Sequence, residues 1–175
     1  MNEKIEKAFN EQLNAELYSG YLYLAMAGYF LAQNFKGFAN WLKMQAMEEL
    51  YHAMKFFNFI DERNGRVDLL PVEGPPNEWE SPLAAFQDAY RHEQYVTGRI
   101  NDLMKLARDE SDFAAESFLK WFVDEQVEEE AQADEVVQQL RRVGDSGHGL
   151  FMLDRELGTR TFVAPPDFAG GGGSE

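Results

Sequence analysis

The segment Glu48-Glu49-Leu50-Tyr51-His52 decides how the rest of the chain is interpreted. On a helix, Glu49 and His52 are three residues apart, so their side chains share one face. Steps of three and four residues through this pair follow a mostly apolar stripe, which is expected to face a core. The stripe contains Phe38, Leu42, Gln45, Glu49, His52, Phe56 and Phe59. Because a buried carboxylate costs several kcal/mol unless it is paired or bound to a metal, other segments must supply partners.

Composition excludes several kinds of site. The 175 residues suffice for one well-buried domain, and they include no cysteine, which excludes disulfides, thiolate zinc sites, iron–sulfur clusters and cysteine nucleophiles. The net charge of −15 disfavours nucleic acid and anionic membranes as partners and favours cations. We expect a cytoplasmic protein, because the N-terminal residues lack a secretion signal and the most apolar stretch is short for a membrane span.

The hydrophobic pattern predicts an all-α fold, a four-helix bundle with a long crossover loop and a short fifth helix at the C-terminal end. The expected helices span residues 3–34, 38–64, 82–109, 112–143 and 146–157. The turn after the first helix is expected at Asn34-Phe35-Lys36-Gly37, and Gly65 is the expected C-terminal cap of the second helix. Residues 66–81 contain three prolines and, when extended, can travel the whole length of a helix of roughly 40 Å. The second and third helices are therefore expected to run parallel. Residues 1–158 form the expected domain, and residues 159–175 are expected to be a flexible tail.

The first helix is apolar on every side between Leu17 and Leu24. One small bundle cannot cover that much apolar surface. The pattern therefore predicts a subunit interface, most simply that of a self-associating dimer.

Polar residues recur at one spacing, which indicates two copies of a helical hairpin. Glu16 precedes Glu49 by 33 residues. The same spacing separates Glu93 from Gln126. His52 follows Glu16 by 36 residues, and Glu129 follows Glu93 by the same 36. Matched positions of two such hairpins are expected to lie level in the bundle. The ionisable residues brought into one cross-section are Glu16, Glu49, His52, Glu93 and Glu129.

Four carboxylates in one cross-section would repel each other unless a cation neutralised them. An oxygen-rich ligand set with one imidazole suits iron or manganese, with zinc as a competitor. Ferritin-like di-iron proteins have a similar set on their four helices. A polar network in a metal-free bundle is the alternative.

From Ile5 to Gly158 the chain resembles the prokaryotic non-haem ferritins. The resemblance rests on Asn14-Ala15-Glu16-Leu17-Tyr18, Met47-Glu48-Glu49-Leu50-Tyr51-His52-Ala53-Met54 and Trp121-Phe122-Val123-Asp124-Glu125-Gln126-Val127-Glu128-Glu129-Glu130. It implies an iron storage protein with ferroxidase activity, which oxidises Fe(II) with O2 at a di-iron centre. It also implies storage as a ferric mineral inside a homo-oligomeric shell of 24 subunits, without haem.

The resemblance also assigns residues. It implies a first iron held by Glu16, Glu49 and His52, and a second iron held by Glu49, Glu93 and Glu129, with Gln126 beside it in the position of a fourth protein ligand. Tyr23 matches the family's tyrosine near the di-iron site, which suggests a catalytic role. A third iron site would comprise Glu48, Glu125 and Glu128, with Glu129 shared. Ordinary solvated glutamates are the alternative for Glu48, Glu125 and Glu128.

Related families fit less well. Bacterioferritin-like proteins carry a second Glu-x-x-His, where this chain has Gln126 and Glu129, and a haem-binding methionine where it has Leu50 and Tyr51. Mini-ferritins lack the fifth helix and build their sites between subunits. Rubrerythrin-like peroxidases, which usually add a Cys-rich iron domain, remain the alternative enzyme class. An acidic helical scaffold without enzymatic activity is the non-enzymatic alternative.

Overall fold

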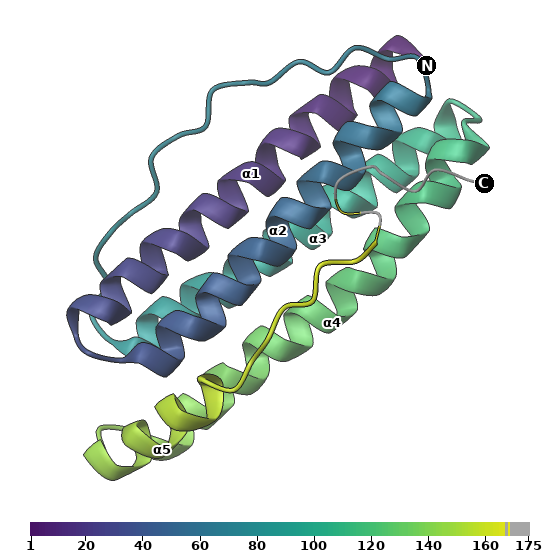
Figure 1. The fold of residues 1–175 in the computed structure, drawn as a ribbon. Coiled ribbons are helices and arrows are strands. Elements are labelled where there is room, and N and C mark those ends of the chain that lie inside the picture. The colour runs from purple at the N-terminus through teal and green to yellow at the C-terminus, as the bar shows by residue number, and fades with distance from the viewer. Residues whose placement is uncertain (167, 169–175) are drawn as a thin grey trace.

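The structure is a computed structural model that describes residues 1–166 and 168. Within these residues the chain forms five α-helices and no β-strand. The helices are α1 (Glu3–Ala32), α2 (Lys36–Glu62), α3 (Pro82–Asp109), α4 (Phe113–Val143) and α5 (Gly147–Leu157). The first four form an elongated bundle, and α5 lies at one end of it (Figure 1). The predicted all-α fold is thus confirmed, whereas residues 167 and 169–175 of the predicted tail lie outside the described residues.

The crossover between α2 and α3 travels the length of the bundle beside α1, so α2 and α3 run in the same direction (Figure 1). Asn10 of α1 fixes the beginning of the crossover. The Asn10 side chain accepts a hydrogen bond from the backbone N–H of Asp68 and donates one to the carbonyl of Arg66. Trp79 holds the end of the crossover by donating from Nε1 to Asp88 Oδ2 of α3 (3.0 Å). Ser81 then caps α3 by accepting a hydrogen bond from the backbone N–H of Ala84. No helix in the described part of the chain combines the length and apolar character that a bilayer crossing requires.

The ends of α2 differ from the prediction, which placed the helix at residues 38–64 with Gly65 as its cap. The helix begins at Lys36 and ends at Glu62. Asn64, with φ of 53°, takes the left-handed conformation that was expected of Gly65. Asparagine adopts this conformation more readily than most side chains, so it can end a helix in place of glycine.

Gly37 lies inside α2, in close contact with α5, and not in the preceding turn as predicted. The N-terminus of α2 has no cap from its own N-cap residue, Phe35. Asp154 of α5 supplies the cap, because its Oδ1 accepts hydrogen bonds from the backbone N–H groups of Gly37 (2.7 Å) and Phe38 (3.0 Å). A carboxylate is favourable at this position because helix N-terminal N–H groups lack partners and carry partial positive charge. The approach needs glycine, since a Cβ atom at position 37 would lie 1.5 Å from the backbone oxygen of Asp154.

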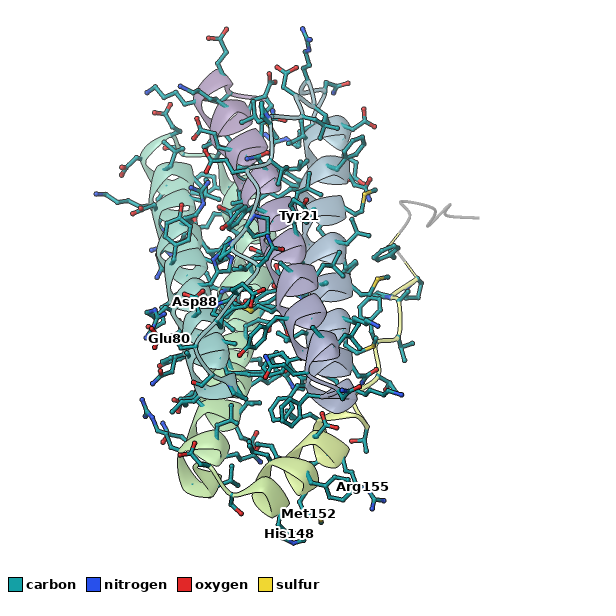
Figure 2. All side chains as sticks on the ribbon, turned by 90° about the vertical axis from the view of Figure 1, so that its left-hand side faces the viewer. Tyr21, Glu80, Asp88, His148, Met152 and Arg155 are labelled. Carbon is teal, nitrogen blue, oxygen red and sulfur yellow. The ribbon has the colours of Figure 1, made fainter. Side chains whose placement is uncertain are left out.

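Two faces of α5 have different surroundings. Leu153 and Leu157 are buried in the bundle core. His148, Met152 and Arg155 point away from the bundle (Figure 2). The fifth helix is therefore attached along one side and closes one end of the bundle.

The core consists of two apolar clusters separated by a layer of polar side chains. Along α1, one cluster ends at Leu13 and the other begins at Leu22. Along α2, the corresponding positions are Ala46 and Phe56. The buried polar residues between the clusters, here called the polar layer, are Gln12, Glu16, Ser19, Gln45, Glu49, His52, Glu93, Gln126 and Glu129. All four helices of the bundle contribute to this layer, as the repeat predicts.

Candidate metal centre

Six side chains of the polar layer were predicted as metal ligands, and the structure brings them together in the bundle core. Each of them is at most 3 % exposed. They are Glu16 of α1, Glu49 and His52 of α2, Glu93 of α3, and Gln126 and Glu129 of α4. Such burial is unusual for glutamate, which is almost never fully buried without a partner.

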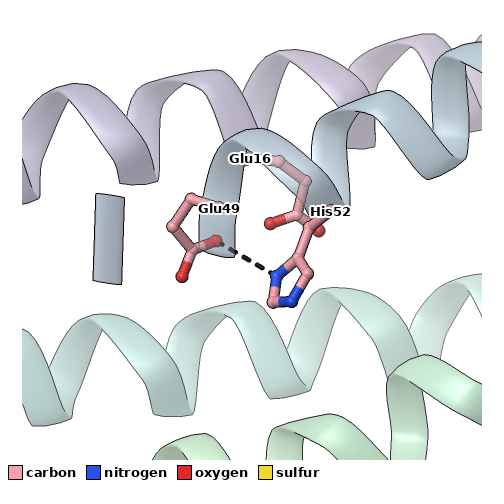
Figure 3. A group of neighbouring side chains, drawn as sticks. All are labelled: Glu16, Glu49 and His52. Atoms are coloured by element: carbon pink, nitrogen blue, oxygen red, sulfur yellow. Dashed lines mark ion pairs between the residues drawn. The ribbon is translucent and has the colours of Figure 1, made fainter. Parts of the chain in front are cut away.

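Glu16, Glu49 and His52 form one side of the centre. Each offers a ligand atom, and these atoms all lie within 4.8 Å of one another. His52 Nδ1 lies 3.4 Å from Glu49 Oε2. The three side chains point from α1 and α2 toward α3 and α4 (Figure 3). Their spacing is that of groups able to bind a single cation.

Glu93 and Glu129 form the other side, and neutral groups fix their positions. The hydroxyl of Tyr23 donates a hydrogen bond to Glu93 Oε1. Gln126 Nε2 donates to Glu93 Oε2 and to the backbone carbonyl of the same residue (both 3.3 Å). Gln45 Nε2 donates to Glu129 Oε2 (2.5 Å) and to Glu49 Oε1 (3.3 Å). Tyr23 and Gln126 therefore contact the centre through the same carboxylate.

Burial raises the pKa of every carboxyl group in the centre. For Glu16 and Glu129 the pKa rises to about 8, with the charges of Glu49 and Glu93, respectively, adding to the effect of burial. The pKa values of Glu49 and Glu93 are raised in the same direction, first by burial and then by neighbouring carboxylates. Burial also raises the pKa of Tyr23 above its ordinary value, so its hydroxyl remains a donor. Without a cation, the centre therefore favours protonated carboxyl groups near neutral pH.

The donor set fits divalent cations. Within residues 1–166 and 168, none of the four glutamates forms an ion pair with lysine or arginine. Glu16 Oε2 is buried and has no hydrogen-bond partner in this part of the chain. An unpaired buried acceptor is costly, and a metal ion would satisfy it. Carboxylate oxygens with one imidazole suit iron or manganese.

Three further glutamates, Glu48, Glu125 and Glu128, were predicted to form a third iron site and are here called the outer acidic cluster. Glu125 offers an oxygen within 4.8 Å of ligand atoms of His52 and Glu129, so this cluster adjoins the centre. Burial raises the pKa of both Glu48 and Glu125. The charge of Glu125 adds a smaller increase to the pKa of Glu48, and the charge of Glu128 adds one to that of Glu125. Glu128 is exposed. Glu125 therefore interacts electrostatically with each of the other two, but among the described residues the ligand atoms of Glu48, Glu125 and Glu128 do not all lie within 4.8 Å of one another.

Two buried glutamines support the centre and were not assigned a role from the sequence. Gln12 Nε2 donates to Glu16 Oε1 (2.8 Å), and Gln45 donates to Glu49. Each glutamine precedes its glutamate by four residues, which places both on one helical face. The Gln-x-x-x-Glu spacing occurs in both α1 and α2, so these contacts could have been predicted from the sequence.

Comparison with known proteins gives the same family from sequence and from structure. The model of the Ferritin-like domain matches residues 6–143. The bacterial non-heme ferritin of Staphylococcus aureus (strain MRSA252) is 40% identical over 162 residues, which cover 93% of this chain and 98% of the relative. The bacterial non-heme ferritin of Bacteroides fragilis is 40% identical over 160 residues, with 91% and 99% covered. The open pore ferritin of the hyperthermophilic archaeon Archaeoglobus fulgidus has a TM-score of 0.91 and 53% identity, covering 92% of this chain and 99% of that chain.

Proposed function

This chain belongs to the ferritin family of iron storage proteins, and on that premise we propose that it oxidises Fe(II) at the buried centre and stores the product as ferric mineral. One observation carries the proposal. Four glutamates and one histidine from all four helices meet in the core, and no lysine or arginine within residues 1–166 and 168 neutralises them. Two iron ions would supply the missing positive charge. Iron is here the substrate of the reaction and the cargo of the protein.

Different residues of the chain are assigned to the two iron positions. Glu16 and His52 serve one iron position, Glu93 and Glu129 the other, and Glu49 is shared between the two. Each Fe(II) loses one electron, and dioxygen accepts both. The hydroxyl of Tyr23 donates a hydrogen bond to Glu93 and holds this carboxylate in position. Apart from the proposed ligands, Tyr23 is the residue to which we assign a catalytic role. Binding of each ion displaces protons from carboxyl groups whose pKa burial has raised, so the site exchanges protons for metal.

We infer that Fe(III), the product of the oxidation, next binds at the outer acidic cluster. Its member Glu125 lies within reach of His52 and Glu129, which are themselves proposed ligands. Iron leaving the centre can therefore pass from carboxylate to carboxylate. We propose this cluster as the third iron site, between the centre and the mineral.

An exposed apolar surface on α1 and α2 supports assembly into a shell. Tyr21 and Leu24 of α1 and Met47 and Leu50 of α2 are 39% to 52% exposed. They line an apolar groove of about 230 Å³. Apolar residues gathered in this way indicate a surface that another subunit covers. We propose that copies of this chain pair here within a shell of 24 subunits.

Several expectations stay predictions. They concern the cytoplasmic location, the domain boundary at residue 158, and the absence of haem, nucleic acid and membrane among the partners. The rubrerythrin-like and scaffold alternatives are less favoured, because the family match extends over residues 6–143.

The two iron positions are expected to bind Fe(II) unequally. One has an imidazole and carboxylates, whereas the other has carboxylates beside Gln126, a neutral amide that donates to Glu93. Anaerobic Fe(II) titration should therefore show two steps that differ by about tenfold in affinity, or about 1.4 kcal/mol. Gln126→Glu adds a charge at the weaker position and should strengthen the second step.

Gln138→Glu provides the matched control, because it adds the same charge to α4 outside the polar layer. This control should leave both steps unchanged. Two equal steps in the parent protein, insensitive to Gln126→Glu, would show that the asymmetry is absent.

A further inference from the structure

The segment that follows α5 is packed against α2. We call residues 158–166 and 168 the C-terminal strap. The strap turns back from the end of the bundle and runs along α2 and α4 (Figure 1). Asn40 Nδ2 donates to the carbonyl of Arg160 (2.9 Å), and further along α2 the rings of Tyr51 and Phe168 stack at 5.9 Å. These two contacts are eleven residues apart on α2, roughly 16 Å, so the strap follows the helix for about three turns.

Arg160 is the residue of the strap with the most polar contacts. Its side chain is only 14% exposed. Nη2 donates to Glu48 Oε2 (2.5 Å) and to Gln132 Oε1 of α4 (3.1 Å). The guanidinium carbon lies 4.2 Å from the ring centroid of Trp41, which is the geometry of a cation–π contact. A positive charge from the far end of the chain is thus seated between α2 and α4.

The carboxylate that binds Arg160 belongs to the outer acidic cluster. Burial raises the pKa of Glu48, and the nearby charge of Glu125 raises it further. Among the groups that lower this pKa, Arg160 has the largest effect, although burial outweighs it. Glu125 in turn lies beside His52 and Glu129. The guanidinium therefore occupies the position of a cation at the edge of the metal centre.

The attachment of Arg160 is incomplete. Both hydrogen bonds of its side chain use Nη2, whereas Nη1 is buried and has no hydrogen-bond partner within the described residues. Arginine binds carboxylates most strongly through two parallel bonds, and this pair has one. A buried donor without a partner further reduces the net stability of the arrangement. The guanidinium of Arg160 therefore makes fewer bonds to Glu48 than its geometry allows.

We propose that the guanidinium of Arg160 occupies Glu48 of the third iron site until a metal ion binds the outer acidic cluster. The metal ion then displaces Arg160 from Glu48, and the strap is released. This inference rests on the proposed function, because it assumes that iron reaches this cluster. Arg160 then sets the affinity of the third site without contacting the di-iron centre. Weak binding at the third site favours onward movement of iron to the mineral.

Zn(II) calorimetry on the assembled, metal-free protein tests the proposal, because zinc binds carboxylates without being oxidised. The relevant step is the one that disappears in Glu128→Gln. Arg160→Ala should strengthen that step at least tenfold, because zinc no longer competes with the guanidinium. Arg160→Lys, which keeps the charge, should show a smaller gain. Adding Glu48→Gln to Arg160→Ala should cancel the gain.

Arg66→Ala is the matched control, since it removes the same charge from a side chain that is 82% exposed and paired with Asp68. An equal gain in this control, or a gain that survives Glu48→Gln, would overturn the proposal as a general effect of charge. Unchanged zinc affinity in Arg160→Ala would overturn it directly. Fe(II) oxidation is measured separately, so a failure of the proposed function would not be mistaken for a failure of this proposal.

A second readout uses the unmodified protein and does not depend on the variants folding. In crystals soaked with Zn(II), anomalous scattering should place zinc beside Glu48 and Glu125, with Arg160 moved away from Glu48. Zinc bound at this cluster while the pair between Arg160 and Glu48 stays intact would contradict displacement.

Discussion

Glu49→Gln should lower the rate of Fe(II) oxidation at least 100-fold while the metal-free protein becomes more stable. Glu49 lies beside Glu16 and His52 on one side and shares Gln45 with Glu129 on the other, so both proposed iron positions lose a charge. A 100-fold loss corresponds to about 2.7 kcal/mol of activation free energy. Stopped-flow oxidation of Fe(II) and thermal unfolding in the presence of a chelator measure the two effects.

The gain in stability should increase with pH. The pKa of Glu49 in the folded protein lies well above its ordinary value of 4.5, chiefly because of burial. A group whose pKa is raised on folding contributes its full stability below the unfolded value, and this is lost as the pH rises through the folded value. Glutamine does not ionise, so the variant keeps the stability that the parent protein loses at Glu49 as the pH rises. The melting temperatures of Glu49→Gln and the parent protein should therefore nearly coincide close to pH 4.5 and separate toward pH 8.

Glu62→Gln is the control on the same helix, because Glu62 is exposed at the end of α2. It should change neither oxidation nor stability. Normal oxidation in Glu49→Gln would place the reaction elsewhere. A melting temperature lower than that of the parent at pH 8 would contradict the electrostatic account of the centre.

Gly37→Ala should detach α5 from the bundle. The added Cβ atom would lie 1.5 Å from the backbone oxygen of Asp154 and 2.4 Å from its carbonyl carbon. Rotation of a side chain cannot relieve a clash with backbone, so α5 must shift. Both hydrogen bonds that Asp154 accepts from the backbone N–H groups at the start of α2 then break. The combined loss of the cap and of the packing of Leu153 and Leu157 is expected to cost about 3 kcal/mol or more.

Thermal unfolding and hydrogen exchange of residues 147–157 measure this effect. Gly98→Ala is the control, because Gly98 is exposed on α3 and an added Cβ atom there meets nothing within 4 Å. That change should stabilise the protein by up to about 1 kcal/mol, as alanine favours helix over glycine. Unaltered exchange in α5 of Gly37→Ala would show that the helix is not held by this contact.

The polar layer was predictable because it follows from periodicity. Helical phase placed Glu49 and His52 on an apolar stripe, and the 33-residue repeat set them level with Glu93 and Glu129. Burial of these four side chains in one cross-section depends only on local spacing and on the hairpin geometry. The crossover was predictable for a similar reason, because its length fits the distance it must travel.

The contacts of the C-terminal part were not predictable from periodicity. Asp154 meets Gly37 across 117 residues, and Arg160 meets Glu48 across 112. Both depend on the angle at which α5 leaves α4, which no repeat in the sequence encodes. Gly37 looked like a turn residue, and Arg160 lay in a segment whose composition indicated a flexible tail.

The central claim is that two Fe(II) ions are oxidised together at the buried centre of each chain. Rapid mixing with dissolved O2, after anaerobic loading with increasing Fe(II), tests it most directly. A fast phase of oxidation should grow with added iron and stop growing at two Fe(II) per chain. No fast phase beyond that of protein-free solution, or one that grows past two without a plateau, would contradict the claim.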